Sequence, residues 1–388
     1  MRSVDVTADR RQYLVRCDDY PHCHALVAPP TPRRLPDPAA VAADLARARQ
    51  ALDGLTAATR LLPNLDMVTR TLARREAVQS SQIEGTRTQL HELLEYEATR
   101  GTDGLPADAL VTERYVEALD HGLAALRQAG ARDALDNRLL RALHAILMQD
   151  APPSARAGDY REEQAWIGTG RIEDASFVPA PPRFIAACMD EFEASILRYT
   201  PAEDEPWALN IVAQVAIAHA QFETIHPFAD GNGRVGRLLM PLMLAAEGHP
   251  PLYLSGVLLR NRRAYYDALA DVQLRGNWQP WVALLCQAVV DACASSIAIA
   301  QDLNLLLDRW TAALADLRAD ATARKLPRYL LGHPVVSANQ VAAAFGISFV
   351  AANKAIEQLV ARGILTEPAR RRNRVFHAAE VIARLERG

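Results

Sequence analysis

The sequence has little that would support a disulfide framework, a secretion signal or a membrane span. Its 388 residues include five scattered cysteines, an odd number that does not suit paired bridges and favours a reducing cytoplasm. The first residues, MRSVDVTADRRQY, contain no apolar segment of the kind a signal peptide needs. The longest nearly uncharged stretch, 282–300, has Asp291 at its centre, which is costly in lipid. We therefore predict a soluble cytoplasmic protein in which this stretch is a buried helix.

Several common functional signatures are also absent. The chain has no G-x-x-x-x-G-K-[ST] phosphate loop, no H-E-x-x-H zinc helix and no G-x-S-x-G nucleophile turn. Its net charge of −3 argues against a chain that coats nucleic acid along its whole length. Half of the residues are apolar and 23% are charged, which is a globular composition, and the length predicts two or three domains.

Apolar residues recur with helical spacing through most of the chain, so we predict a mainly α fold. One helix is expected to start near Asp204 as its N-cap, with Pro206 in its first turn. The predicted helices cover 67–83, 86–99, 106–128, 134–149, 182–197, 204–225, 234–247, 255–274 and 280 to about 319. The predicted domains are an extended segment 1–38, a helical region 39–115, a core 116–275, connecting helices 276–320 and a C-terminal domain 321–388.

Two local patterns interrupt the helices. Short β-prone runs at 165–167 and 176–178 flank a polar tract and predict a hairpin, which fits a flap better than part of a sheet. Near the N-terminus, Cys17, His22, Cys23 and His24 suggest a zinc site. They lack paired C-x-x-C spacing and a second distant pair, so an ordinary N-terminal segment is the better interpretation.

Residues 226–237, HPFADGNGRVGR, join two apolar helical segments and combine features of a phosphate site. Gly231, Asn232 and Gly233 open onto a helix N-terminus, where backbone N–H groups and the helix dipole favour an anion. Arg234 and Arg237 are three residues apart, so they can share one face of that helix and suit a polyphosphate.

Two further side chains flank this loop. His226, as a neutral imidazole, could accept a proton from an incoming hydroxyl group. The Asp230 carboxylate, beside phosphate oxygens, could hold Mg²⁺. Each residue alone fits an ordinary turn between helices, but the combination at fixed spacing favours a functional site.

The segment resembles the signature of the Fic family, H-x-F-x-[DE]-G-N-G-R-x-x-R, at every position. That family is mostly helical and typically transfers AMP from ATP to a Ser, Thr or Tyr hydroxyl of a target protein. The resemblance implies that His226 is the general base, that Asp230 binds Mg²⁺ and that Phe228 anchors the loop in the core.

The same resemblance implies how ATP is held. Gly231, Asn232 and Gly233 would form the anion hole for the α- and β-phosphates. Arg234 would assist the phosphates, and Arg237 would hold the γ-phosphate.

Two other segments agree with the family pattern. Residues 158–161, with the runs up to 179, resemble the flap on which a target segment aligns as an added strand. Residues 260–269 resemble the stretch that closes the adenine pocket. Tyr265 and Tyr266 are candidates for lining it, and packing within the helix is an equally good interpretation of both.

A second motif lies N-terminal to the signature. Residues 80–85, SSQIEG, match the family's inhibitory pattern [ST]-x-x-x-E-[GN]. Ser80 and Glu84 are four residues apart on a helix, so both can face one neighbour. The resemblance implies that Glu84 pairs with Arg237, and its charge would also repel the γ-phosphate, so ATP would bind only non-productively. An exposed helix end with a glycine cap is the alternative.

The last 68 residues hold 11 Lys/Arg and 4 Asp/Glu, which marks them as a separate basic domain. Two short helices, a strand, an arginine-rich tip at 369–373 and a return strand resemble a winged helix between about 337 and 376. Arg370, Arg371, Arg372 and Arg374 would lie on the wing. DNA binding, protein docking and a solvent-exposed charged surface all fit this pattern.

The leading interpretation is thus a protein adenylyltransferase restrained by its own helix, with ATP as substrate and Mg²⁺ as cofactor. One alternative is Fic-type chemistry on another phosphoryl group, or removal of AMP from a target. Another is a nucleotide-sensing regulator that acts through the C-terminal domain. The resemblance also allows a homodimer and self-modification, and the sequence does not identify the target.

Overall fold

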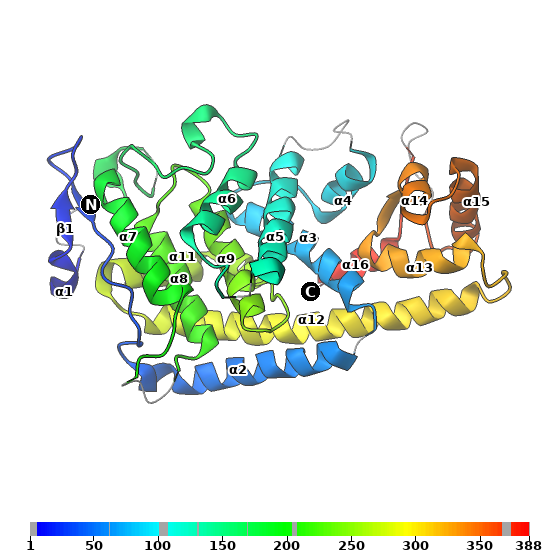
Figure 1. The fold of residues 1–388 in the computed structure, drawn as a ribbon, viewed down its shortest axis with the longest axis horizontal. Helices are drawn as coiled ribbons and strands as arrows, with labels where there is room; N and C mark the ends of the chain where they lie inside the picture. The colour runs from blue at the N-terminus through cyan, green and yellow to red at the C-terminus, as the bar shows by residue number, and fades with distance from the viewer. Residues whose placement is uncertain are drawn as a thin grey trace. The chain divides into compact units, whose positions relative to one another are not determined.

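The computed structural model describes residues 6–61, 63–100, 108–129, 132–168, 170–203, 208–366 and 374–387 (Figure 1). The protein is mostly helical, which confirms the predicted fold class. It divides into unit 1, Met1–Gly54 with Glu117–Ala292, and unit 2, Leu55–Val116 with Cys293–Gly388. Three helices have residues in both units: α2 (Pro38–Leu61), α5 (Ala109–Ala129) and α12 (Gln279–Ala313). The five consecutive segments predicted from the sequence therefore do not coincide with these units.

Unit 1 contains the consecutive helices α8 (Ile211–Ile225) and α9 (Asn232–Ala246), which pack against each other (Figure 1). Every residue of α8 is buried, including polar residues such as His219 and Glu223. The other elements of this unit are α1 (Ala8–Arg11), β1 (Leu14–Arg16), β2 (His24–Leu26), α6 (Asn137–Leu147), η2 (Pro153–Ala155), η3 (Ile172–Asp174), η4 (Pro182–Phe184), α7 (Ile185–Phe192), η5 (Glu193–Leu197), α10 (Ser255–Arg260) and α11 (Arg262–Arg275).

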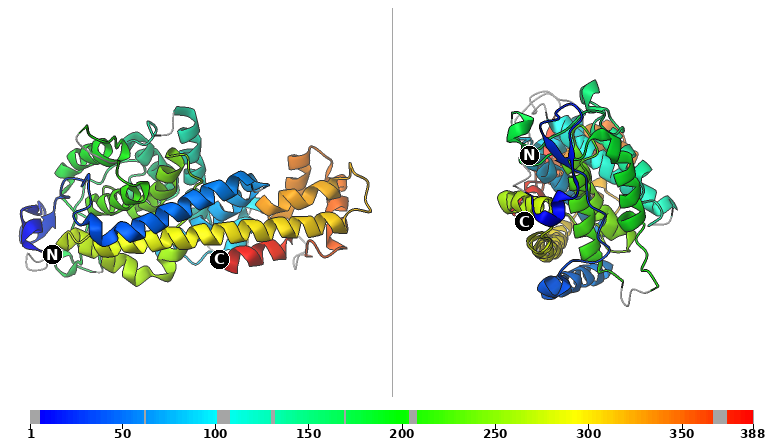
Figure 2. Two further views of the ribbon diagram at one scale, coloured as in Figure 1. Left: turned by 90° about the horizontal axis from the view of Figure 1, so that it is seen from below. Right: turned by 90° about the vertical axis from the view of Figure 1, so that its left-hand side faces the viewer.

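The N-terminal segment is more ordered than the sequence suggested. Strands β1 and β2 pair antiparallel, with Leu14 opposite Leu26 and Arg16 opposite His24. Figure 2 shows this part of the chain in dark blue at one end of unit 1. The Leu26 N–H donates to the Val178 oxygen at 2.9 Å, so the N-terminal hairpin is bonded to the second run of the predicted flap.

The predicted flap is a hairpin with a single bridge. Ile167 pairs antiparallel with Phe177, and its N–H donates to the Phe177 oxygen at 2.8 Å. The 3₁₀ helix η3 lies in the tract between the two runs. Phe177 is buried, which explains why so short a pairing holds its position.

Two predicted helices differ from the structure in their ends or in their type of helix. Helix α8 begins at Ile211, because the Asn210 side chain caps it by accepting from the Val212 N–H. The N-cap predicted at Asp204 and the first-turn Pro206 lie outside the described residues. The predicted helix 182–197 is a 3₁₀ turn, an α-helix and a final turn of π-helix.

Helix α12 is the one described helix whose length and composition would let it cross a membrane. Buried core helices of soluble proteins meet the same criteria, and 44% of its most apolar window is buried. Trp281 is fully buried, and its indole N–H donates to the Ala216 oxygen of α8 at 2.8 Å. One face of α12 thus packs into unit 1.

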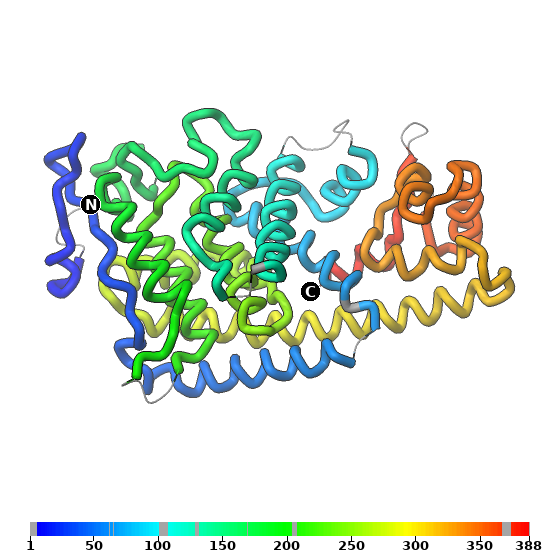
Figure 3. The backbone as a smooth tube through the Cα atoms, in the orientation of Figure 1, coloured from blue at the N-terminus to red at the C-terminus, as the bar shows by residue number. Residues whose placement is uncertain are grey.

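Unit 2 contains α3 (Leu65–Ile83), α4 (Leu90–Thr99), α13 (Thr322–Gly332), β3 (Val335–Ser337), α14 (Ala338–Phe345), α15 (Phe349–Val360), β4 (Val375–His377) and α16 (Ala379–Arg387). Figure 3 shows α13–α16 as the orange-to-red part of the chain.

Strands β3 and β4 pair antiparallel, and Thr366 bridges to His377. The Ser337 hydroxyl caps α14 by accepting from the Gln340 N–H. The arginine-rich tip lies outside the described residues, so the winged helix stays a prediction.

Candidate active site

The loop that carries the signature, residues 226–231, connects α8 to α9 within unit 1. His226 is the C-cap of α8 and adopts a left-handed conformation, with φ of 51°. A non-glycine residue there costs about 1–2 kcal/mol, so neighbouring contacts must hold it. Gly231, at φ 78°, is the N-cap of α9. A Cβ on Gly231 would lie 3.1 Å from the Met148 sulfur, so glycine is needed for both conformation and space.

Asn232 holds the middle of the loop from inside. Its side-chain oxygen accepts from the Phe228 N–H at 2.9 Å, and its Nδ2 donates to the Phe228 oxygen at 2.8 Å. Both groups are buried. The family resemblance implies that Asn232 belongs to the anion hole; its side chain also holds the loop, and its backbone N–H lies at the start of α9.

Phe228 is the anchor that the sequence predicted. It is fully buried, and its ring stacks on His144 of α6, with centroids 3.8 Å apart and planes 8° apart. Tyr160 and Phe222 complete its surroundings.

His144 holds the end of the loop, a role that sequence reasoning missed. Its Nδ1 accepts from the Gly158 N–H at 2.9 Å, so the neutral ring carries its proton on Nε2 and donates it to the Asp230 oxygen at 3.0 Å. Burial, with the nearby Arg234 charge, lowers the pKa of His144 to about 4, so the ring is neutral at physiological pH.

Arg161 holds the beginning of the loop. Its Nε donates to the His226 oxygen at 2.9 Å, and its backbone N–H donates to the Pro227 oxygen at 3.0 Å. The same guanidinium donates to the Ala180 oxygen, just after the flap, at 2.5 Å. Burial lowers the pKa of Arg161 to about 10, so it stays charged at neutral pH. One buried arginine therefore links the flap to His226.

The first turn of α9 can bind an anion. The first hydrogen bond of the helix joins the Val235 N–H to the Gly231 oxygen at 3.0 Å. The N–H groups of Asn232, Gly233 and Arg234 come before it, as at every helix start. Arg234 and Arg237 are both buried, so two positive charges lie in the helix that carries these groups.

The two side chains proposed for chemistry flank this turn. His226 is one-fifth exposed, and its Nδ1 lies 3.8 Å from the Glu223 carboxylate. That carboxylate would stabilise the charge the imidazole gains on taking a proton. The Asp230 side chain is 68% exposed, and its Oδ1 accepts from the Gly231 N–H at 2.5 Å. An exposed carboxylate beside an anion-binding turn fits the ligand chemistry of Mg²⁺.

The two tyrosines have different positions. Tyr265 is 1% exposed, its hydroxyl lies 2.8 Å from His219 Nε2, and its ring packs near Trp281. The ring therefore packs in the core, and its assignment to the adenine pocket stays a prediction. Tyr266 is 40% exposed beneath Arg262 and stays a candidate.

The inhibitory motif ends helix α3 in unit 2. Ser80 is fully buried, whereas Glu84 is exposed and is the C-cap, followed by Gly85 at φ 98°. Arg237 belongs to unit 1, and its pairing with Glu84 stays a prediction.

The fold and this loop define a helical protein in which a histidine lies beside the N-terminus of a buried helix. Two family models match the chain: "Fic/DOC family N-terminal" over residues 42–124 and "Fic/DOC family" over residues 134–244. Together they cover half of its length. The chain belongs to the Fic/DOC family.

Curated relatives are named protein adenylyltransferases. Protein adenylyltransferase Fic of Aedes aegypti is 32% identical over 125 residues, 32% of this chain and 22% of that protein. The Drosophila melanogaster protein is 30% identical over 140 residues, 36% of this chain and 25% of that protein. This chain thus spans about a quarter or less of the length of these relatives.

Solved structures share the fold. A Fic family protein from Desulfovibrio desulfuricans G20 has a TM-score of 0.54 and 20% identity, covering 90% of this chain and 98% of that chain. A Fic domain containing signaling protein from Bacteroides thetaiotaomicron has a TM-score of 0.52 and 21% identity, covering 66% and 98%.

Proposed function

We propose that this protein is a protein adenylyltransferase that moves AMP from ATP to a Ser, Thr or Tyr hydroxyl of a target protein. The observation that carries the proposal is the loop between α8 and α9. Hydrogen bonds from Arg161, Asn232 and His144 fix its backbone at 226, 227, 228 and 230, so a histidine is held beside a helix N-terminus with two buried arginines. The names of the relatives support the same activity.

The geometry suggests how the reaction proceeds. The N–H groups at the start of α9, with Arg234 and Arg237, would bind the phosphates of ATP. His226 would take the proton of the target hydroxyl, whose oxygen attacks the α-phosphorus. The bond between the α-phosphorus and the bridging oxygen breaks, and pyrophosphate leaves. Mg²⁺, held by Asp230, would neutralise phosphate charge.

The flap supplies a place for the target. A target segment in an extended conformation would align with 165–178 by main-chain hydrogen bonds. Arg161 contacts both the carbonyl after the flap and the carbonyl of His226, so the two are held in a fixed relation. That arrangement would bring a side chain of the target to the imidazole.

The activity is proposed to be restrained by Glu84. Its carboxylate would pair with Arg237 and withdraw that arginine from the γ-phosphate. A charge-assisted hydrogen bond contributes about 1.5–3 kcal/mol. Losing the restraint should therefore raise transfer by about 10–100-fold.

The test is transfer from labelled ATP in a cell lysate with Glu84→Gly. Label on target proteins that disappears in the double variant Glu84→Gly/His226→Ala supports the proposal. Label that persists without His226 would rule out its role as the base. Label that appears only from γ-labelled ATP would identify phosphoryl transfer instead.

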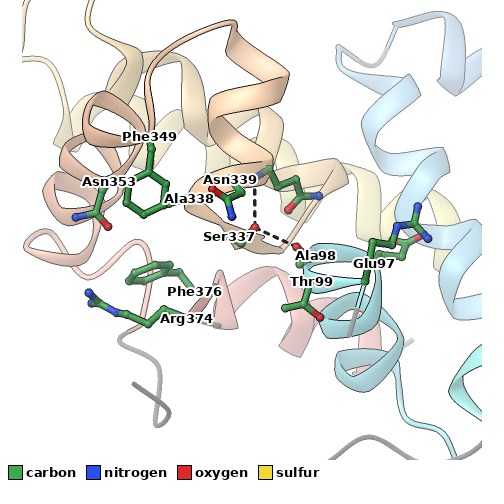
Figure 4. A pocket seen from close by; sticks show the side chains of 12 residues that line it. Glu97, Ala98, Thr99, Ser337, Ala338, Asn339, Phe349, Asn353, Arg374 and Phe376 are labelled. Atoms are coloured by element: carbon green, nitrogen blue, oxygen red, sulfur yellow. Dashed lines mark hydrogen bonds between the residues drawn. The ribbon is translucent and has the colours of Figure 1, made fainter. Parts of the chain in front are cut away.

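A second candidate function, DNA binding, is favoured by one observation in unit 2. A pocket of about 660 Å³ lies where α15 and β4 meet α4 and the start of α14, and it combines two aromatic rings with polar side chains. Figure 4 shows Phe349, Asn353, Arg374 and Phe376 around it. The Arg374 guanidinium lies 5.0 Å from the Phe376 ring centroid. Amide and arginine groups are among the side chains that bind a duplex.

Fluorescence anisotropy with duplex DNA at two salt concentrations tests this second candidate. Lys354 is exposed on α15, and Lys325 is exposed on α13. We expect Lys354→Ala to weaken binding and lower the salt slope by about 1, and Lys325→Ala to have less effect. Equal effects, or no binding, would argue against a specific duplex site.

A further inference from the structure

We propose that His22, Cys23 and Glu173 form a zinc site that ties the N-terminal hairpin to the flap. The His22 Nε2 lies 2.7 Å from a Glu173 carboxylate oxygen. One ligand atom from each of the three residues lies within 4.8 Å of the others. The two halves of this cluster are separated by 150 residues in sequence but come together in unit 1.

This ligand set differs from the one that the sequence suggested. Cys17 and His24 do not join the cluster, although the structure describes both of them. Glu173, which no local spacing rule indicated, takes their place. The site is therefore a link between two segments and not a loop closed within the hairpin.

Ordered structure holds each ligand residue in place. The Cys23 N–H donates to the Tyr20 oxygen at 2.8 Å, and the Cys17 N–H donates to the Cys23 oxygen at 3.2 Å, which fixes the turn. Glu173 lies in η3, whose Ile172 is buried in the same apolar cluster as Cys23 and Phe177. The ring of Tyr20 packs edge-on against both His22 and Trp166 of the flap.

The donor set suits zinc. Sulfur, imidazole nitrogen and carboxylate oxygen are the three ligand types that Zn²⁺ prefers, at about 2.0–2.3 Å from the metal. Such bonds place neighbouring ligand atoms about 3.3–3.6 Å apart in a tetrahedron, within reach of side-chain rotation from the observed cluster.

Charge balance also favours the ion. Binding releases the Cys23 thiol proton to solvent, and the thiolate and the Glu173 carboxylate then neutralise the two positive charges. The His22 and Glu173 side chains are 59% and 39% exposed, which gives the ion an entry path and leaves the fourth position to water.

The consequence for the flap follows from where η3 lies. A metal bond at Glu173 would restrain the tract between Ile167 and Phe177, which pair through a single bridge. The zinc site itself does not depend on AMP transfer. Its effect on target binding rests on the function proposed above.

The experiment is metal analysis of the full chain after zinc loading and dialysis, with the cobalt spectrum as a second readout. We expect one zinc per chain and a thiolate-to-cobalt charge-transfer band. Cys23→Ser, His22→Gln and Glu173→Gln should each weaken zinc binding by more than the roughly 10–100-fold that losing an outer-shell partner costs. Each has a matched control close by in sequence: Cys17→Ser, His24→Gln and Asp174→Asn, which should retain the metal.

The zinc content of the wild-type chain tests the proposal even if a variant fails to fold. Absence of bound zinc in the folded wild-type chain would overturn it and leave an ordinary His–Glu ion pair. Retention in Glu173→Gln with loss in Cys17→Ser or His24→Gln would overturn it in favour of a hairpin-only site. Measuring AMP transfer in parallel separates the two proposals, because zinc content is read without any activity.

Discussion

Replacing His144 with leucine tests how the loop after α8 is held. Leucine keeps an apolar side chain of similar bulk against Phe228 but removes both ring nitrogens. The Gly158 N–H and the Asp230 carbonyl then lose the partners that lie 2.9 and 3.0 Å away. Both bonds are partly buried and a hydrogen bond contributes about 0.5–1.5 kcal/mol, so we expect the free energy of unfolding to fall by about 1–3 kcal/mol at neutral pH.

The pH dependence of that loss is the sharper test. The folded-state pKa of His144 is lowered to about 4 from 6.5, mainly by burial. The unfolded chain therefore binds more protons between these values, and the stability this residue contributes is complete above 6.5 and lost as the pH falls toward 4. The free energy of unfolding should fall by about 2 kcal/mol by about pH 5, and by about 3 kcal/mol once the pH is below both pKa values.

Urea unfolding followed by circular dichroism at neutral pH and near pH 5 measures this difference. The difference in free energy of unfolding between wild type and His144→Leu should be about 2 kcal/mol smaller near pH 5 than at neutral pH. The control, His121→Leu on the exposed side of α5, should change stability by less than about 0.5 kcal/mol. A gap that stays constant or widens in acid would refute the assignment of a buried neutral imidazole.

Three further changes test the site. Asn232→Ala removes both bonds to Phe228, and we expect transfer to fall by about 100-fold, as for a reacting group misplaced by about 1 Å, in a single-turnover assay. Arg161→Lys cannot reproduce the contacts to both the His226 and Ala180 carbonyls, so urea unfolding should show a loss of about 3 kcal/mol. Glu84→Gly should raise self-modification or target modification by about 10–100-fold, measured by incorporated label, and an unchanged rate would remove the inhibitory role.

The sequence was sufficient for features that depend on local spacing. Eight positions in 226–237 match a signature, and the structure places Phe228 in the core and Gly231 at the start of α9. Helical periodicity likewise located α3 and α9 to within a few residues. These features depend on contacts between residues close in the chain, which a pattern can encode.

The features that the sequence missed depend on contacts between distant segments. His144 lies 86 residues from Asp230, and Glu173 lies 151 residues from His22. A lone histidine on α6 or a glutamate in a polar tract gives no signal by itself. The two tyrosines of α11 show the same limit. Sequence spacing could not distinguish the buried position of Tyr265 from the exposed position of Tyr266.

Intact-mass measurement of a purified target, or of the chain itself, after incubation with Mg-ATP and the Glu84→Gly variant tests the central claim most directly. If the loop between α8 and α9 acts as proposed, the mass should increase by one AMP, and this increase should disappear when His226→Ala is added. A gain of one phosphate, or an AMP gain that survives without His226, would contradict it.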